Sequence, residues 1–402
     1  MASSDLTAGR PDVFARGQRW ARESLFADRN DTLLTLAAAL FGVALAAPTL
    51  RWMLTQADFH IVHANMRLLL IGRFPREEEW RIWIPVLLVA ALSGASWGTM
   101  SRPSRRGMVF AAVLAALCLA ATTTEEALVW AGGGIALGAA SLAGALFLKQ
   151  RSMWLLQRVV SVGWITVWPL GVLLLLAFGG VPTAQWGGFY LNLLVTAVAA
   201  MGALPVGLAL ALARRGPYRV LRWAATGYIE ITRGLPLIVV LILSWLAVQR
   251  FLPSLFGLNT VGLLPRLLTA YILFTAVYVA VAINGGLNGL PRGQAEACKA
   301  LGMSGTQSLR LVLLPQAFRR ALPSLAGELI DLLMSSTLIS VLGLTEMLAA
   351  ARATTEQPAF FGRQKEVLLF VGLLFWTVAF TLSRLSRRLE RRLSGGSGIG
   401  DR

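Results

Sequence analysis

The chain has 402 residues, of which 56% are hydrophobic and 14% charged, and its formal net charge is +17. Apolar runs that reach or approach the roughly 20 residues needed to cross a bilayer core recur along it, which excludes a soluble globular protein. These runs are too long for outer-membrane barrel strands of about 10 residues, and with only Cys118 and Cys298 the sequence argues against a disulfide framework or a metal cluster. We therefore expect an all-α membrane protein.

Ten segments are predicted to cross the membrane. The first begins only after about 30 mostly polar residues, which is not the pattern of a signal peptide, so we expect it to be retained. The second and third are the shortest. In chain order the segments are Leu33–Met53, Ile82–Gly98, Met108–Thr122, Ala127–Leu148, Val159–Gly179, Leu191–Ala213, Leu235–Leu252, Leu267–Ile283, Leu322–Met347 and Val367–Leu385.

The distribution of Lys and Arg predicts the orientation. With an even number of spans both termini share one side, and most of the 37 basic residues fall in segments on that side. Because cytoplasmic loops carry an excess of Lys and Arg, we predict that both termini are cytoplasmic. Topology and anionic headgroups account for the basic surplus, so no nucleic-acid partner is expected.

The sequence lacks a phosphate-binding loop of the G-x-x-x-x-G-K-[ST] type, since Lys149, Lys299 and Lys365 are followed by Gln, Ala and Glu. An ion-coupled carrier would be expected to place carboxylates or histidines inside its spans. Few are visible: Asp331 lies roughly 12 Å into the ninth predicted span, and Glu346 lies near its outer end. This scarcity favours an external motor.

Residues 294–315, QAEACKALGMSGTQSLRLVLLP, form a polar loop between two apolar runs. The pattern predicts a short amphipathic helix, a C-terminal cap at Gly302 and a second helix that returns to the membrane. In the first helix, Ala295, Cys298 and Leu301 recur at helical spacing as a small apolar face. A folded polar loop of this kind indicates a binding site for a soluble partner protein. The alternative is a connecting helix packed on the chain's own inner face.

The spacing in this loop carries a family resemblance. It resembles the EAA loop of permease subunits in bacterial ATP-binding-cassette (ABC) importers, through Glu296-Ala297-Cys298, three residues, Gly302, nine residues and Val312-Leu313-Leu314-Pro315. Three wider stretches are similar to the polar amino-acid permease family: Tyr228–Leu237, Gly286–Ser304 and Leu314–Leu325. The segment Trp20–Leu40 resembles the long subunit of general L-amino-acid permeases.

The resemblance implies a type I importer permease core at residues 186–393, with the EAA loop at 286–322. Accessory transmembrane helices would occupy residues 32–185, after a cytoplasmic segment at 1–31 and before a tail at 394–402. The residues implied to couple the chain to an ATPase are Gln294, Glu296, Ala297, Cys298, Leu301, Gly302, Leu314 and Pro315.

The resemblance also implies the partners and the location. They are a cassette ATPase dimer that carries ATP-Mg, a second permease subunit, an extracytoplasmic solute-binding protein and an amino-acid substrate. The chain itself is expected to bind no cofactor or metal and to catalyse no reaction. It would lie in the bacterial inner membrane as a multi-pass protein.

The substrate path departs from the family pattern. Where the family has Y-x-A-E-x-x-R-G-G, the charged positions hold Val281 and Asn284, although Tyr278 is kept. A K-[DN]-[ST]-S-L stretch appears as Met334-Ser335-Ser336-Thr337-Leu338. Two roles stay open for the hydroxyls, lining a polar path or bonding the preceding turn's carbonyls. The candidate path residues are Asp331, Ser335, Ser336, Thr337, Tyr278 and Asn284.

These departures lead to the hypothesis that the chain is half of a heterodimer whose partner carries most substrate-binding charges; a homodimer remains an alternative. For Asp331, the alternative to a path role is a hydrated carboxylate or one paired with Arg319 or Arg320. Other function classes stay open as well: an ion-coupled secondary transporter, an ABC permease for another small polar solute, and a membrane scaffold or receptor.

Overall fold

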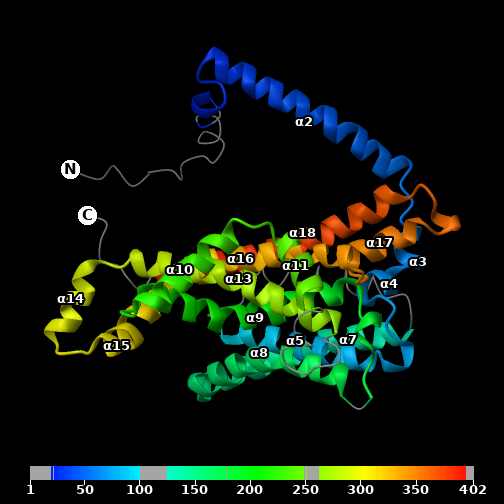
Figure 1. Ribbon diagram of the computed structural model, residues 1–402. Helices are drawn as coiled ribbons and strands as arrows, with labels where there is room; N and C mark the ends of the chain where they lie inside the picture. Colours follow the sequence, from blue (N-terminus) through cyan, green and yellow to red (C-terminus); the bar gives the residue numbers. More distant parts are fainter. Residues whose placement is uncertain are drawn as a thin grey trace, which may run out of the picture. The chain divides into compact units, whose positions relative to one another are not determined.

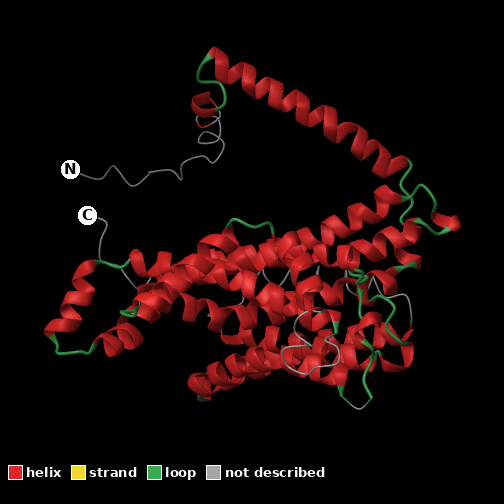
Figure 2. Cartoon of the chain, viewed as in Figure 1, coloured by secondary structure: helices red, strands yellow, loops and turns green. Residues whose placement is uncertain are grey.

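The computed structural model describes residues 20, 22–99, 125–177, 179–248, 250 and 262–394. Within these ranges the chain consists of helices and loops without a strand (Figure 2), and extended pairing is limited to one isolated parallel bridge between Gly188 and Glu346. The chain divides into two compact units, Met1–Phe59 and His60–Arg402, and each is described by itself.

The first unit contains one long apolar helix, α2 (Arg29–Thr55). It begins after Asp28, whose side chain accepts a hydrogen bond from the Arg29 N–H at 2.7 Å. None of its residues is buried. A helix that is apolar all round and unburied is suited to lipid or to another apolar helix, as the first predicted span requires.

The second unit opens with short helices and three long ones. The short ones are α3 (His60–Ala64), α4 (Met66–Ile71) and the 3-10 turn η1 (Arg76–Glu78). The long ones are α5 (Trp80–Thr99), α7 (Glu125–Arg151) and α8 (Met153–Leu176), followed by the turn η2 (Thr183–Gln185). In Figure 1 α5, α7 and α8 lie together beside α9.

Small residues bring α5 and α7 into close contact. A Cβ on Gly94 would lie 2.1 Å from the carbonyl oxygen of Gly138, and a Cβ on Gly98 would lie 2.5 Å from the Cβ of Ala145. Inside a membrane, helix association depends on such close backbone approach rather than on the hydrophobic effect. The two helices are therefore packed at positions that only glycine can occupy.

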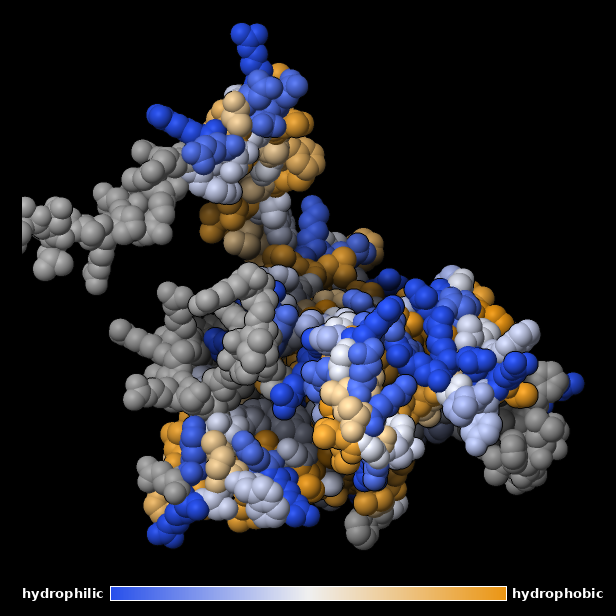
Figure 3. All heavy atoms as spheres, turned by 90° about the vertical axis from the view of Figure 1, so that its left-hand side faces the viewer, coloured by the Kyte–Doolittle hydropathy of each residue, from blue (hydrophilic) through white to orange (hydrophobic). Residues whose placement is uncertain are grey.

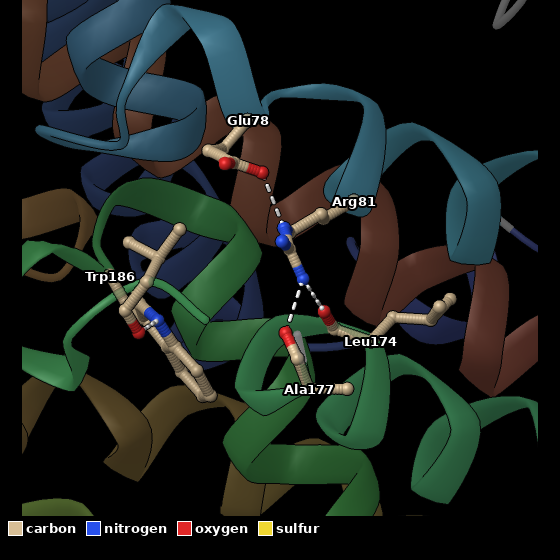
Figure 4. Close-up of polar contacts among 6 residues, drawn as sticks. Glu78, Arg81, Leu174, Ala177 and Trp186 are labelled. Carbon is tan, nitrogen blue, oxygen red and sulfur yellow. Dashed lines mark hydrogen bonds and ion pairs between the residues drawn. The ribbon is translucent and has the colours of Figure 1, made fainter. Parts of the chain in front are cut away.

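A buried arginine joins α5 to the end of α8 (Figure 4). Arg81, 4% exposed, donates from Nη1 to the carbonyl oxygens of Leu174 and Ala177, each at 2.7 Å. Its Nε lies 2.5 Å from Oε2 of Glu78. The last carbonyls of a helix lack partners within the helix and carry partial negative charge. Arg81 therefore satisfies the C-terminal end of α8 and holds α5 against it.

The remaining elements form the core of the second unit. They are α9 (Gly188–Arg215), α10 (Arg219–Arg233), α11 (Leu237–Leu243), the π-helix η3 (Ser244–Val248), α13 (Leu263–Asn288), α14 (Arg292–Ala300), α15 (Gly305–Gln307), the π-helix η4 (Ser308–Leu313), α16 (Leu314–Ser335), the 3-10 helix η5 (Ser336–Leu342), α17 (Met347–Thr355), the 3-10 turn η6 (Pro358–Phe360) and α18 (Gln364–Ser394).

Helix α13 lies at the centre of this core, between α9 and α16. A Cβ on Gly207 of α9 would lie 2.6 Å from the Ala276 carbonyl oxygen, and one on Gly286 of α13 would lie 2.3 Å from that of Ala317. Tyr271 is fully buried, and its hydroxyl donates to the carbonyl oxygen of Ser335 at 2.7 Å. Close backbone contacts thus hold the three helices together.

Eight described helices are long and apolar enough to span a membrane, or nine if the bent pair α10 and α11 counts as one span. The expectation of an all-α membrane protein is confirmed. The predicted third span, Met108–Thr122, lies outside the described residues.

The seventh predicted span, Leu235–Leu252, is described only in part, as α11 and η3; residues 249, 251 and 252 lie outside the described residues. It begins at a bend of 109° between α10 and α11, around Gly234 and Pro236, where proline disfavours helical backbone in the residue before it. The ninth span lies in a continuous helical run, Gly305–Leu342, and ends at Leu342 rather than at Met347. Gly343, at φ +94°, ends it in the left-handed region that favours glycine.

The second unit has two different ends (Figure 1). Helices α14 and α15 project at one end, and α3, α4 and α17 lie at the other. Figure 3, which faces the α14 end, shows hydrophilic side chains gathered over it, with hydrophobic ones along the sides. We call these the α14 end and the α17 end.

Candidate functional site

Helix α14 is closed by glycine, as predicted. Gly302 has φ +72°. Its N–H donates to the Lys299 carbonyl oxygen at 2.9 Å, and the Met303 N–H donates to that of Cys298 at 3.0 Å. This pair of bonds is a Schellman motif. Because other residues pay about 1–2 kcal/mol for the left-handed conformation, Gly302 sets the turn after α14.

The next turn is capped as well. Ser304 and Gln307 form a reciprocal capping box at the start of α15, with the Ser304 N–H 2.9 Å from Gln307 Oε1 and the Gln307 N–H 3.3 Å from Ser304 Oγ. The π-helix η4 then leads directly into α16. The polar loop predicted at residues 294–315 is therefore a folded structure with defined turns.

The predicted coupling residues differ in exposure. Glu296, Ala297, Gly302 and Pro315 are exposed and Leu314 is half-buried. Leu301 is 80% exposed, whereas Cys298 is buried at 4%. Cys298 thus faces its own chain and Leu301 faces away, so these two do not share one apolar face. A side-chain hydrogen bond joins the loop to the bundle: Gln316 Nε2 of α16 donates to Gln294 Oε1 of α14 at 2.6 Å.

Asn284 lies where the family pattern would have a basic residue, and it contacts a basic residue from another helix. The Nε of Arg215, at the end of α9, donates to Asn284 Oδ1 at 2.6 Å, and its Nη2 donates to Asn284's carbonyl oxygen at 3.2 Å and to Asn288 Oδ1. Asn284 Nδ2 is buried without a hydrogen-bond partner. The structure thus supplies a cation beside Asn284 from α9.

Glu230 pairs with two arginines at the same end. Arg214 Nη2 lies 3.0 Å from Glu230 Oε1, and Arg233 Nη1 lies 3.7 Å from Oε2. All three side chains are a third or more exposed. Such exposed pairs contribute little stability, and this one mainly orders the end of α9 against α10.

The three candidate path hydroxyls bond to the preceding turn. Ser335 Oγ donates to the Leu332 carbonyl oxygen at 3.0 Å, Ser336 Oγ to that of Leu333 at 2.6 Å, and Thr337 Oγ1 to that of Met334 at 2.9 Å. This is the second of the two roles that the sequence left open. Ser336 is fully buried, and Ser335 and Thr337 are half-buried.

The remaining two candidate path residues, Asp331 and Tyr278, differ from these hydroxyls in their exposure and contacts. Asp331 is exposed on α16, and within the described ranges no ion pair joins it to Arg319 or Arg320. Tyr278 is half-buried on α13, and its ring centroid is 5.2 Å from that of Phe274. Asp331 is therefore a carboxylate that lies within a membrane span and is exposed on the surface of the chain.

The structure reveals a polar cluster that we did not predict from the sequence. It consists of Asn192, Ser336 and Glu346, each 0% exposed. Asn192 Nδ2 donates to Ser336 Oγ at 2.8 Å and to Glu346 Oε2 at 3.2 Å. The signals in the sequence are an Asn at the start of one predicted span and a Glu near the outer end of another, and neither shows that the two meet.

Glu346 caps a helix from inside this cluster. Its Oε2 accepts from the Leu348 N–H at 2.8 Å and its Oε1 from the Ala349 N–H at 2.9 Å, at the start of α17. Burial raises the pKa of the Glu346 carboxyl above its ordinary value of 4.5, and these hydrogen bonds, Asn192 and the charge of Arg352 act in the opposite direction. The carboxylate therefore combines a helix cap with a long-range contact.

Comparisons with known proteins cover both the core and the whole chain. The family model described as "Binding-protein-dependent transport system inner membrane component" matches residues 203–395. The inner membrane amino-acid ABC transporter permease protein YhdY of Escherichia coli K12 is 28% identical over 404 residues, covering 95% of this chain and 94% of that one.

Two further relatives differ in how much of this chain they match. The glutamate/glutamine/aspartate/asparagine transport system permease protein BztC of Rhodobacter capsulatus is 30% identical over 436 residues, covering 97% of each chain. The glutamate/aspartate import permease protein GltK of Escherichia coli O6:H1 is 33% identical over 208 residues, covering 51% of this chain and 91% of its own length. The N-terminal helices are thus shared with some relatives and lacking in the match to others.

Proposed function

This chain belongs to the permease subunits of amino-acid ABC transporters, and from that membership we propose that it forms one side of an amino-acid path and is driven through α14 by a separate ATPase. It is a multi-pass inner-membrane permease subunit of an ATP-driven amino-acid importer. The observation that carries the coupling proposal is the geometry at residues 292–316: a capped helix that is exposed on one side and bonded to α16 on the other.

Mechanical reasoning supports α14 as the point of coupling. Glu296, Ala297 and Leu301 are available to a partner, while Cys298 is packed against the permease itself. Motion of a partner bound to the exposed side would be passed to α16 through the Gln294–Gln316 bond and through η4. Nucleotide-driven closure of the ATPase would then shift the permease between two states by differential contact.

Charge supports a cytoplasmic location for the α14 end. Arg214, Arg215 and the arginines after Thr381 on α18 belong to this end, with few acids among them. At the α17 end, Arg67, Arg81 and Arg363 are each paired with a glutamate, at 2.6, 2.5 and 3.7 Å. Cytoplasmic segments carry an excess of Lys and Arg, and from this excess we propose that the α14 end and both termini lie in the cytoplasm.

The energy source is proposed to lie outside this chain. Its sequence has no phosphate-binding loop, so ATP and Mg²⁺ would be bound by the ATPase partner. We propose that the chain itself holds no cofactor and catalyses no reaction. Its other proposed partners are a second permease subunit and an extracytoplasmic solute-binding protein, in keeping with the binding-protein-dependent family.

An amino acid is the proposed substrate. The name of one full-length relative lists glutamate and aspartate together with glutamine and asparagine. The first two carry a charged side chain and the other two a neutral one. A path that takes both kinds would recognise the shared α-ammonium and α-carboxylate groups. Asp331 is the candidate for the ammonium, because an exposed carboxylate within a span is costly unless it meets a cation or water.

The sparse charge along this chain's spans supports a heterodimer in which the second permease carries the other polar contacts. Asn284 and Tyr278 remain candidates for the path. Ser335 and Thr337 are weaker ones, because their hydroxyl protons are already bonded to Leu332 and Met334.

Reconstitution tests the proposal. The chain is inserted into vesicles with its candidate ATPase, second permease and binding protein, and uptake of labelled glutamate and glutamine is measured. We expect uptake that requires ATP and continues when ionophores collapse the ion gradients. Uptake that survives without the ATPase and stops with ionophores would identify a secondary carrier instead.

The role of α14 is tested in the same vesicles. Replacing the exposed Glu296 with alanine, Glu296→Ala, is expected to leave membrane insertion intact and to abolish most uptake. The matched control is Glu390→Ala, an exposed glutamate of α18 outside the loop, which should transport normally. Full uptake by the Glu296→Ala variant would refute coupling at this position.

A further inference from the structure

The cluster of Asn192, Ser336 and Glu346 brings three segments together. Asn192 lies on α9, Ser336 begins η5, and Glu346 precedes α17. Besides its bonds to the other two side chains, Asn192 accepts at Oδ1 from the Met347 N–H at 3.1 Å. One asparagine and one glutamate thus join the start of η5, the start of α17 and the N-terminal part of α9.

The backbones around the cluster are packed as closely as atoms allow. The Gly188 N–H donates to the Thr345 carbonyl oxygen at 2.9 Å. A Cβ on Gly187 would lie 2.5 Å from that same oxygen, and a Cβ on Gly72, at φ +70°, would lie 2.5 Å from the Gly187 Cα. The segment around Gly72, which follows α4, is therefore packed against the same junction.

Beyond the junction lies the surface of the α17 end. Two contacts hold the loop after α17: Gln357 Nε2 donates to Asn65 Oδ1 at 3.0 Å, and the rings of His60 and Phe360 lie tilted at 43° with centroids 6.0 Å apart. It presents Phe361, 86% exposed, outside the spans. The cluster contains one of the candidate path hydroxyls, Ser336, and Glu346 directly precedes α17, so it joins this surface to the candidate path.

We propose that Glu346 is a positioning residue of the importer: through Asn192 and Ser336 it holds α17, which faces the binding protein, in register with η5, which begins the outer end of the path. The inference rests on the proposed function, since it assigns this end to the side on which a loaded binding protein docks. A buried carboxylate is costly unless its hydrogen bonds are made. Glu346 makes them to two different segments, whereas a cap alone would need only the N–H groups of α17.

A role limited to folding makes a different prediction from a positioning role. Loss of folded molecules lowers the maximal uptake rate and leaves unchanged the concentration of loaded binding protein that gives half-maximal uptake. Loss of register weakens productive docking and raises that concentration. The ratio of these two kinetic quantities therefore separates the two roles.

The test uses the complete importer in vesicles with increasing loaded binding protein. For Glu346→Ala we expect the half-maximal concentration to rise about tenfold, which corresponds to about 1.4 kcal/mol. For Glu390→Ala, an exposed glutamate near the C-terminal end of α18 and outside the α17 end, we expect no change. An unchanged half-maximal concentration in Glu346→Ala, with active wild-type importer, overturns the inference; an inactive wild type would instead refute the proposed function.

A double-mutant cycle keeps the inference testable if Glu346→Ala does not fold. Asn192→Asp places two carboxylates at the 3.2 Å contact and should raise the half-maximal concentration. Adding Glu346→Gln restores one donor between the two side chains and should recover at least half of the loss. If the second substitution adds to the defect of the first, the direct contact does not position the outer end and the inference fails.

Discussion

The Nη1 atom of Arg81 lies 2.7 Å from the carbonyl oxygen of Ala177, although the two residues are 96 positions apart. This contact joins the start of α5 to the end of α8 at a buried site. It holds together two helices, α5 and α8, that precede residues 203–395, the part of the chain that the family model matches.

Replacing this arginine should destabilise the protein. Arg81→Met leaves the carbonyls of Leu174 and Ala177 unsatisfied and Glu78 without its cation, and we expect a loss of about 3 kcal/mol. The melting temperature in detergent, followed by the fluorescence of the 13 tryptophans, should fall by several degrees. Arg73→Met, at an exposed position, is the control, and equal melting temperatures would show that the contact is unimportant.

The contact between α5 and α7 predicts opposite effects for two glycine substitutions. Gly94→Ala forces a Cβ against the Gly138 carbonyl oxygen and should cost about 1–3 kcal/mol as overpacking. Gly132→Ala lies on α7 where a Cβ meets nothing within 4 Å, so it should be neutral or slightly stabilising. Thermal unfolding of both variants in detergent decides this, and a Gly94→Ala variant as stable as the wild type contradicts the packing.

The turn after α14 predicts a selective defect in coupling. Gly302→Ala strains a residue at φ +72° and should cost about 1–2 kcal/mol locally, which displaces α14. We expect ATP-dependent uptake to fall several-fold while the melting temperature changes little. Gly305→Ala, three residues later without a positive φ and with open space around it, should transport normally. Equal uptake by both variants would show that the turn at Gly302 is not needed for coupling.

Glu346 predicts a pH dependence of stability. Its pKa in the folded state lies above 4.5, so the unfolded chain releases this proton first as the pH rises. Stability from this group is therefore fully present below 4.5 and is lost as the pH rises through the folded-state pKa. Arg352 on α17 is the cation that opposes the shift.

The comparison with Glu346→Gln isolates this ionisation. The melting temperature of the wild type minus that of the variant should fall between about pH 4 and about pH 7. A difference that stays constant, or that grows with pH, would show that burial does not raise this pKa.

Asp331 and Ser335 should respond differently to substitution. Asp331→Asn removes the exposed carboxylate on α16 and should reduce uptake about tenfold or more if it meets the α-ammonium group, in line with about 1.5–3 kcal/mol for a charged hydrogen bond. Ser335→Ala removes a hydroxyl already bonded to its own helix and should change uptake less than twofold. If Ser335→Ala reduced uptake more than Asp331→Asn, the hydroxyls rather than Asp331 would be the residues that line the path.

The sequence predicted much of the architecture and the α14 loop. Long apolar runs have one stable backbone solution in lipid, because every backbone polar group must bond within the segment. Gly302 could be recognised as a cap because its position between a short amphipathic stretch and a polar turn leaves few other roles. Both inferences depend on local order along the chain.

The path was predicted less well. Ser335, Ser336 and Thr337 were recognisable as a cluster of hydroxyls, yet only coordinates show that each one donates to its own helix. The pairing of Arg215 with Asn284 could not be read from the chain either, since these residues lie on different helices, 69 positions apart.

By itself the sequence determined that this is a helical membrane protein, that it resembles an importer permease, and where its polar loop interrupts the spans, because hydropathy and turn chemistry act over neighbouring residues. Only the tertiary structure decided that Asn192 meets Glu346, that Arg81 closes the end of α8, and that Cys298 turns inward while Leu301 turns out. Those contacts depend on which faces of distant helices pack together, and in an apolar bundle close backbone approach sets that choice, which no short pattern records.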